Sequence, residues 1–200
     1  MRQVYAFDFD GTLTRSDTLV AFIRYACGLR AMLWGCVCCS PWIVLMLAHL
    51  YPNYKAKQRL FAHFFRGWTL SRFDEACRDF AHTHRHLLRV GGEAAMRQAL
   101  ANGAEVAIVS ASIDNWVKPF FDDIVKAGLP LTVLGTKIES AGGIVTGRFS
   151  TPNCYGPEKV RRIREAFPCR AEYSLTAFGD SRGDKEMLDY ADRKYYKPFR

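Results

Sequence analysis

The segment DFDGTLT at residues 8–14 constrains the fold most, because it places two carboxylates two residues apart at the end of a short apolar run. The run, Val4 to Phe9, predicts a buried strand. The carboxyl end of such a strand is where an open α/β sheet presents its chemistry, and Gly11 lets the backbone turn closely around a bound group. A plain polar turn is the alternative, since Asp and Gly also gather at turns for local reasons.

Polar groups follow two later segments in the same way. The β-branched run 106–109 ends at Ser110-Ala111-Ser112, and residues 174–178 lead into GDSRGD at 179–184. Between them, Lys159 begins a predicted helix that reaches Phe167 and is stopped by Pro168. Each piece alone has an ordinary explanation as a helix cap or a surface residue. The ordered set of carboxylates, hydroxyl, lysine and carboxylates favours one site at the strand ends.

This order resembles the haloacid dehalogenase superfamily of phosphohydrolases, and within it subfamily IB, the phosphoserine phosphatase-like branch. The matching pieces are DFDGTLT at 8–14, SAS at 110–112, EK at 158–159 and GDSRGD at 179–184. Two pieces depart from the branch, which usually shows Ser-Gly-Gly and Gly-Asp-Gly-x-Asn-Asp. The departures leave the chemistry intact and place phosphoserine as the substrate in doubt. The resemblance implies an α/β fold, a doubly wound parallel sheet with a helical cap inserted after the first strand.

Hydrophobic periodicity divides the chain in agreement with that fold. Residues 15–90 show helical spacing without a convincing strand, and Gly91-Gly92 precedes an alternation of helix and strand. We predict a core domain from residues 1–14 and 91–200 and a cap domain from residues 15–90. We predict that the core contains helices 93–102 and 114–126, strands 105–109 and 131–136, and a small hairpin within 137–150 near the site mouth.

The resemblance implies a phosphomonoester hydrolase that works through an aspartyl-phosphate. Asp8 would attack phosphorus, while Asp10 would protonate the leaving oxygen and later deprotonate water. A phosphate dianion repels a carboxylate nucleophile, so a cation is required. Mg²⁺ suits the hard oxygen ligands that Asp8, the carbonyl of Asp10 and Asp180 would supply.

Further site residues are expected around this pair. The phosphoryl oxygens would be held by a predicted set comprising Gly11, Thr12, Ser110, Ala111 and Lys159. Asp184 would position Lys159 or a water beside the metal. Substrate contacts are predicted at Asp17, the nearest match to a cap acid of the branch, and at Arg59 and Asn153; a helix cap or a solvated helix face explains Asp17 and Arg59 equally well.

Several functions fit these residues. The first is hydrolysis of a small phosphorylated metabolite such as phosphoserine. Alternatives are a phosphatase of a lipid head-group phosphate, similar to phosphatidylglycerophosphatases at the membrane surface, and a phosphotransferase that uses the same site. A non-catalytic partner-binding protein is disfavoured by the intact acids Asp8, Asp10 and Asp180.

The run Ala31–Tyr54 contains no Asp, Glu, Lys or Arg and is long enough to span a bilayer. One span would put Asp8 on one side and Ser110, Lys159 and Asp180 on the other, so we reject it. Pro41 predicts two short helices forming a hairpin. Cap core, a dimer contact and a peripheral membrane contact through 31–54 all stay open as explanations.

Composition narrows the partners and the compartment. The net charge of +8 comes from Lys and Arg spread along the chain, which favours a generally basic surface over a nucleic-acid site. Seven cysteines form an odd set, and no signal peptide precedes Val4, so we expect a cytoplasmic protein with reduced thiols, with membrane association left open. Cys36 and Cys39 are expected to be buried small hydrophobes. His82 and His86 are expected to share a helix face without a metal.

Overall fold

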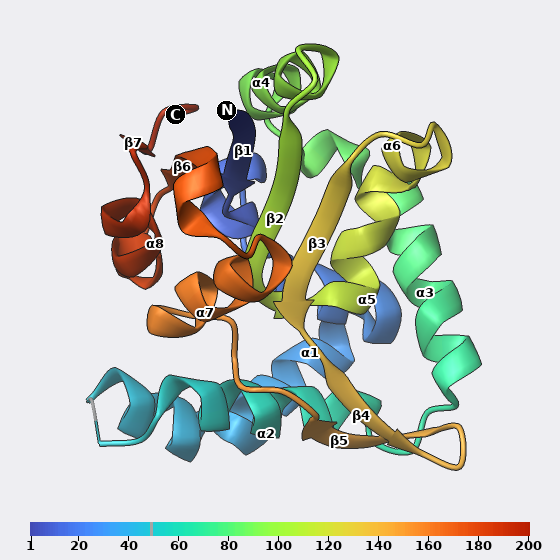
Figure 1. Ribbon diagram of the computed structural model, residues 1–200. Helices are drawn as coiled ribbons and strands as arrows, with labels where there is room; N and C mark the ends of the chain where they lie inside the picture. The colour runs from blue at the N-terminus through green and yellow to red at the C-terminus, as the bar shows by residue number, and fades with distance from the viewer. Residues whose placement is uncertain (49) are drawn as a thin grey trace.

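The computed structural model describes residues 1–48 and 50–200, and its centre is a sheet of five strands (Figure 1). The strands are β1 (Arg2–Phe7), β2 (Glu105–Ile113), β3 (Leu131–Thr136), β6 (Tyr173–Gly179) and β7 (Arg193–Tyr196), in the order β3-β2-β1-β6-β7. All four pairings are parallel. The chain winds outward from β1 to β3 and then returns to the other side of β1, so the strand order reverses between β1 and β6. This doubly wound α/β sheet confirms the predicted fold class.

Helices cover both faces of the sheet. The helices are α1 (Thr18–Leu47), α2 (Asn53–Phe65), α3 (Leu70–Thr83), α4 (Val90–Ala101), α5 (Asp114–Val117), α6 (Asp122–Lys126), α7 (Pro157–Ala166) and α8 (Lys185–Tyr190). Side chains of β1 alternate between two cores: Phe7 packs with α1 to α5, while Val4 and Ala6 pack with α7 and α8. In Figure 1, α1 and α2 lie across the carboxyl edge of the sheet.

The predicted core elements differ from the structure at their ends. β2 continues past residue 109 to Ile113 through an irregular register, so Ser110 and Ser112 lie on the strand and not in a following loop. The predicted helix 114–126 is broken into α5, a 3₁₀ segment over Lys118–Phe121, and α6, because Pro119 supplies no backbone donor to an α-helix. The hairpin within 137–150 is present as β4 (Ile138–Ala141) and β5 (Ile144–Phe149), and β5 packs on α2. The domain boundaries stay a prediction.

The prediction that Pro41 separates two short helices is wrong. Residues 29–47 are helical through Pro41, and the sharp bend in α1 lies earlier, at Gly28, whose φ of 82° suits glycine. Pro41 has no N–H to donate to the carbonyl of Val37, but the hydroxyl of Ser40 donates to that oxygen at 2.7 Å. The helical hairpin of the cap is therefore formed by α1 and α2, which pack on each other.

Two smaller expectations also fail. Cys39 is buried, but Cys36 is only half-buried. His82 and His86 do not share a helix face, since α3 ends at Thr83 and His86 belongs to a 3₁₀ segment.

Aromatic packing joins the cap helices to the core. Phe22 of α1 is fully buried, and its ring lies 5.2 Å from that of Phe65 and 5.3 Å from that of Phe80. On the core side, the indole of Trp116 stacks against it at 5.1 Å. Phe22 thus holds α1, α2 and α3 against the element that follows β2.

We expect Phe22→Ala to lower the free energy of unfolding by about 3–5 kcal/mol, because truncation removes buried apolar surface and leaves a cavity. Urea unfolding followed by circular dichroism measures the change. Val20→Ala, at a position of the same helix that is half exposed, is the matched control and should change stability by less than about 0.5 kcal/mol. Equal effects of the two substitutions would contradict the packing role of Phe22.

Candidate active site

Lys159 is the buried centre of the site. It lies in the first turn of α7, which Pro157 begins, and it is 2% exposed. Its Nζ donates to Oδ1 of Asp8 at 2.6 Å, to Oδ1 of Asp184 at 2.6 Å and to the carbonyl of Val109 at 2.7 Å. Burial by itself would lower the pKa of Lys159, but the two carboxylates outweigh it and raise that pKa above its ordinary value. The ammonium therefore stays charged and links β2 to the segments that follow β1 and β6.

Asp8 follows β1 directly and enters this centre. Its backbone N–H donates to the carbonyl of Phe178 at 2.9 Å, which extends the β1–β6 pairing to the strand end. Burial raises the pKa of Asp8 to about 7, although Lys159 pulls it down. Only 6% of Asp8 is exposed, and a cation beside its carboxylate would favour the ionised form.

Asp10 lies on the turn after β1 but has a different environment. Its Oδ1 accepts from the backbone N–H and the hydroxyl of Thr18, both at 2.7 Å, and its Oδ2 accepts from the hydroxyl of Ser112 at 2.5 Å. Burial, with a contribution from nearby Asp17, raises the pKa of Asp10. A raised pKa and fixed hydroxyl partners suit a group that gives and takes a proton.

Gly11 permits the turn that separates these two carboxylates. Its φ is +83°, and a Cβ at this position would lie 2.5 Å from Oδ2 of Asp180. A side chain here would thus collide with an acid of the site. The turn brings the β1 end and the β6 end within contact.

Three acids form a buried group that fits a divalent cation. Oxygen atoms of Asp8, Asp180 and Asp184 lie within 4.8 Å of one another. Asp184 is held in place because its Oδ2 accepts from the backbone N–H groups of Asp180 and Ser181, at 3.1 Å and 3.0 Å. Asp180 pairs with Arg200. Hard carboxylate oxygens at such spacing are the donors that Mg²⁺ prefers. The carboxylate of Asp10 is engaged elsewhere, so only its carbonyl is available to this group.

The residues predicted to hold phosphate fall into two sets. Gly11, Ala111 and Lys159 line one cavity with Asp8 and Asp10. Ser110 and Thr12 are buried behind it. The Oγ of Ser110 accepts from the backbone N–H of Ser112 at 2.9 Å, and the Oγ1 of Thr12 has no hydrogen-bond partner within the described residues.

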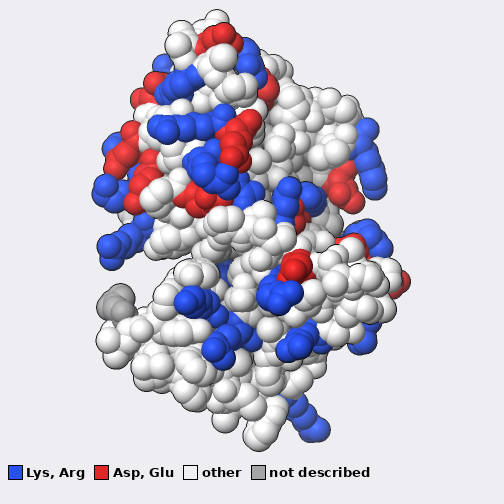
Figure 2. All heavy atoms as spheres, turned by 60° about the horizontal axis from the view of Figure 1, so that its bottom comes forward, with Lys and Arg blue, Asp and Glu red and all other residues white. Residues whose placement is uncertain are grey.

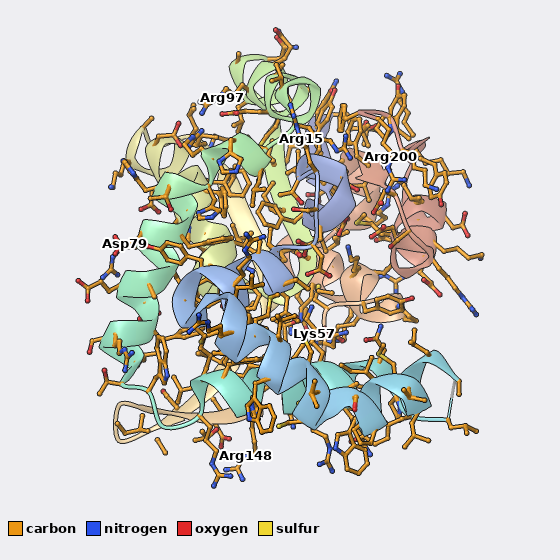
Figure 3. The ribbon with its side chains drawn as sticks, turned by 180° about the vertical axis from the view of Figure 1, so that it is seen from behind. Arg15, Lys57, Asp79, Arg97, Arg148 and Arg200 are labelled. Atoms are coloured by element: carbon orange, nitrogen blue, oxygen red, sulfur yellow. The ribbon has the colours of Figure 1, made fainter. Side chains whose placement is uncertain are left out.

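The cavity has a volume of about 610 Å³ and lies between the carboxyl edge of the sheet and the α1–α2 hairpin, where Figure 2 shows the surface hollowed. Its polar lining beyond the acids includes Arg15, Asp17, Lys57, Asn153 and Arg200. Lys57 donates to the carbonyl of Ala111 at 2.9 Å and lies between the hairpin and the sheet (Figure 3). Its apolar lining is supplied by the hairpin and the start of α1: Leu19, Ile43, Met46, Ala56 and Leu60.

The predicted substrate residues are placed unequally. Asp17 lines the cavity, but its carboxylate accepts from the backbone N–H of Leu19 at 2.8 Å and so caps α1. Asn153 lines the cavity and accepts from Thr136 at 3.2 Å. Arg59 does not line it: its guanidinium stacks on Trp42 at 3.9 Å and donates to the hydroxyl of Tyr51. The β4–β5 hairpin, expected near the site mouth, does not line this cavity either.

Sequence reasoning did not single out four residues that the structure brings to the site. Ser112 could have been predicted, because it lies two residues after Ser110 and residues two apart on a strand share a face. Thr18 had only the weak signal of a hydroxyl at a helix start. Lys57 was not distinguishable from its neighbours in the cap, and Arg200 is distant in sequence from every motif.

Residues 5–189 match the family model described as haloacid dehalogenase-like hydrolase, and the chain belongs to this family. The protein CicA of Caulobacter vibrioides is 36% identical over 200 residues, which cover 98% of this chain and 86% of CicA. A protein of unknown function from Bordetella pertussis Tohama I has a similar structure, with a TM-score of 0.80, 20% identity and coverage of 97% and 89%. A phosphoserine phosphatase in its apo form matches with a TM-score of 0.63, 18% identity and coverage of 98% and 86%. The fold is thus one that phosphoserine phosphatases share.

The buried charge of Asp8 predicts a pH-dependent stability in the absence of divalent ions. Its pKa is about 7 in the folded protein against an ordinary value of 3.8, so between these values the folded chain keeps a proton that the unfolded chain has lost. The free energy of unfolding therefore falls as the pH rises through this interval. We expect Asp8→Asn in EDTA to melt at a higher temperature than the parent at pH 8, with a smaller difference at pH 5.

Thermal unfolding followed by circular dichroism measures both differences. Asp79→Asn is the matched control, since Asp79 is exposed on α3, away from the site (Figure 3). A lower melting temperature for Asp8→Asn at pH 8 would show that the Asp8 carboxylate stabilises the metal-free fold.

Proposed function

We propose that this protein is a Mg²⁺-dependent phosphomonoester hydrolase that works through an aspartyl-phosphate on Asp8. The observation that carries the proposal is the division of two carboxylates on one turn. Asp8 contacts Lys159 in an acidic, cation-ready pocket, whereas Asp10 is held by the hydroxyls of Thr18 and Ser112. Adjacent carboxylates in such different surroundings suit a nucleophile and a proton shuttle.

Asp8 would attack phosphorus with the carboxylate oxygen that Lys159 does not hold. The P–O bond to the alcohol breaks as the bond to Asp8 forms, and Asp10 gives its proton to the departing oxygen. Asp10, now ionised, removes a proton from water, which attacks phosphorus and releases inorganic phosphate and free Asp8. Lys159 offsets negative charge on Asp8 and on the phosphoryl group throughout.

Mg²⁺ would be held by the carboxylates of Asp8 and Asp180 and by the backbone carbonyl of Asp10, with Asp184 supporting the group through Lys159. When bound, the ion would supply charge that offsets repulsion between the phosphate dianion and Asp8. The chain's own residues supply the remaining parts. Ala111 would bring its backbone N–H to the phosphoryl oxygens, and the N–H of Gly11, which donates to the hydroxyl of Thr14 at 3.3 Å, would have to exchange that partner to do the same.

Substitution of the two acids should separate their roles. With p-nitrophenyl phosphate and Mg²⁺, we expect Asp8→Asn to lose at least ~10³-fold in turnover and to show no burst. Asp10→Asn should still release a burst of nitrophenolate, up to one equivalent per chain, because this leaving group needs no proton. Its steady state should be slow, since no base activates water. Rapid-quench measurements of nitrophenolate and phosphate test both, with Asp79→Asn as the control. A burst from Asp8→Asn would exclude it as the nucleophile.

Two substrate classes suit different walls of the cavity. A small phosphorylated metabolite such as phosphoserine is supported by the polar groups of Lys57 and Asn153 and by the fold shared with phosphoserine phosphatases. Against phosphoserine itself, Asp17 is engaged as a helix cap and Arg59 stacks outside the cavity.

A lipid head-group phosphate is the second candidate, and a specific observation favours it. Ile43 and Met46 of α1 and Leu60 of α2 form an apolar wall in the cavity that holds Asp8. Such a wall offers nothing to a charged amino acid but can contact the hydrocarbon next to a phosphate ester.

A series of n-alkyl phosphates of increasing chain length distinguishes the two classes. If the apolar wall contacts the leaving group, kcat/KM should rise by up to ~4-fold for each methylene buried, which corresponds to about 0.8 kcal/mol. Ile43→Gln should flatten the rise and leave the shortest ester unchanged. We expect the rise; a flat series in the parent protein would leave small polar esters as the substrate class.

A further inference from the structure

The second half of α1 has an apolar face that no described part of the chain covers. Five side chains on it, and Leu50 shortly after the helix, are between 55% and 75% exposed; the five are Leu33, Trp34, Val37, Val44 and Leu47. The helical members recur at spacings of three, four and seven residues and so form one stripe, which we call the outer apolar face. The opposite side of the same helix is used for packing, where Gly35 lies directly against Phe64 of α2.

Helices of this protein that face water look different. On the outer side of α7, Arg161 pairs with Glu158 and Glu165. The outer apolar face has no charged residue at all, since Ala31–Tyr54 lacks Asp, Glu, Lys and Arg. A helix that is apolar on both sides is typical of a protein interior or of contact with lipid. Only 11% of the apolar window of α1 is buried, so the interior explanation does not hold for it.

Charges around the face select one kind of partner. Residues 18–73 contain no Asp or Glu, while the cations in this range are Arg24, Arg30, Lys55, Lys57, Arg59, Arg66 and Arg72. Figure 2 shows the hairpin side of the molecule largely uncharged or basic. Arg59 of α2 stacks on Trp42 of α1 and donates a hydrogen bond to Tyr51, which follows α1. An exposed apolar face on a segment whose charged residues are all basic matches an anionic lipid surface. We propose that the outer apolar face docks the protein on an anionic bilayer.

The hairpin would lie in the membrane interface and not cross it. Residues 29–47 are long enough to span, at about 28 Å. A span would, however, carry the start of α2 with Lys55 and Lys57 across the bilayer. Because α2 packs on β5 and supplies Lys57 and Leu60 to the cavity, it cannot leave the catalytic side. A second copy of the chain would bring two sets of cations together, which disfavours a dimer through this face.

Docking would also orient the cavity. Ile43 and Met46 line it from α1, the helix that carries the outer apolar face. The cavity is therefore about one helix diameter, ~10 Å, from the lipid head groups. This proposal does not depend on the proposed function, because it concerns binding and is tested without turnover.

Co-sedimentation with vesicles tests the proposal on the full chain. We expect the parent protein to pellet with vesicles of phosphatidylglycerol and phosphatidylcholine, and less with phosphatidylcholine alone. Val37→Glu should weaken binding by at least ~10-fold, because a carboxylate enters the apolar contact near anionic lipid. Val125→Glu is the matched control: Val125 is 54% exposed on α6, close to the 62% of Val37, and this variant should bind like the parent.

Insertion of the outer apolar face into the membrane and dimer formation are measured by separate experiments. Brominated lipids should quench part of the tryptophan fluorescence, and Trp34→Phe should reduce that quenching while the variant still binds. Thermal melting confirms that each variant is folded. Failure of the parent to bind anionic vesicles, or equal loss in Val37→Glu and Val125→Glu, would overturn the proposal. So would a dimer in light scattering that only Val37→Glu dissociates, since the face would then serve a second copy.

Discussion

The buried ammonium of Lys159 is the interaction on which the site depends. It contacts a carboxylate after β1, the carbonyl of Val109 within β2 and a carboxylate after β6, so one side chain links three neighbouring strands. Burial disfavours its charge, and the neighbouring carboxylates outweigh that effect. The same arrangement collects three acids in a small volume, which leaves negative charge that a divalent cation would balance. The contacts that hold the strands together at Lys159 therefore also assemble the acids that could bind a cation.

Much of the core and its site could be predicted because the determining signals are local. Short β-branched runs that end in Asp or Ser are readable as strand ends, and parallel strands bring such ends to one edge. Gly11 was readable in the same way, since a glycine between two acids indicates a backbone that turns tightly. The structure gathers Asp8, Gly11, Lys159 and Asp180 at that edge.

The structure of the cap was harder to predict, because it depends on hydrogen bonds and contacts that no local sequence pattern indicates. Pro41 normally interrupts a helix, yet the hydroxyl of Ser40 satisfies the carbonyl that the proline leaves free. Arg59 and Lys57 look alike in sequence, but they lie two residues apart and so on opposite sides of α2, one against Trp42 and the other at the carbonyl of Ala111. The pairing of Arg200 with Asp180 depends on how the chain end packs, for which no local pattern exists.

The α1–α2 hairpin connects the two proposals through one structural element. The inner side of α1 supplies an apolar wall to the cavity, and its outer side is the exposed apolar face. A soluble metabolite requires neither feature. Exposed Leu, Val and Trp side chains oppose solubility, and an apolar wall gives no binding energy to a polar leaving group. One lipid membrane would account for both features. Its surface would contact the outer apolar face, and the hydrocarbon of a lipid substrate would contact the apolar wall of the cavity. The two sides of α1 therefore favour an amphiphilic phosphate ester over phosphoserine.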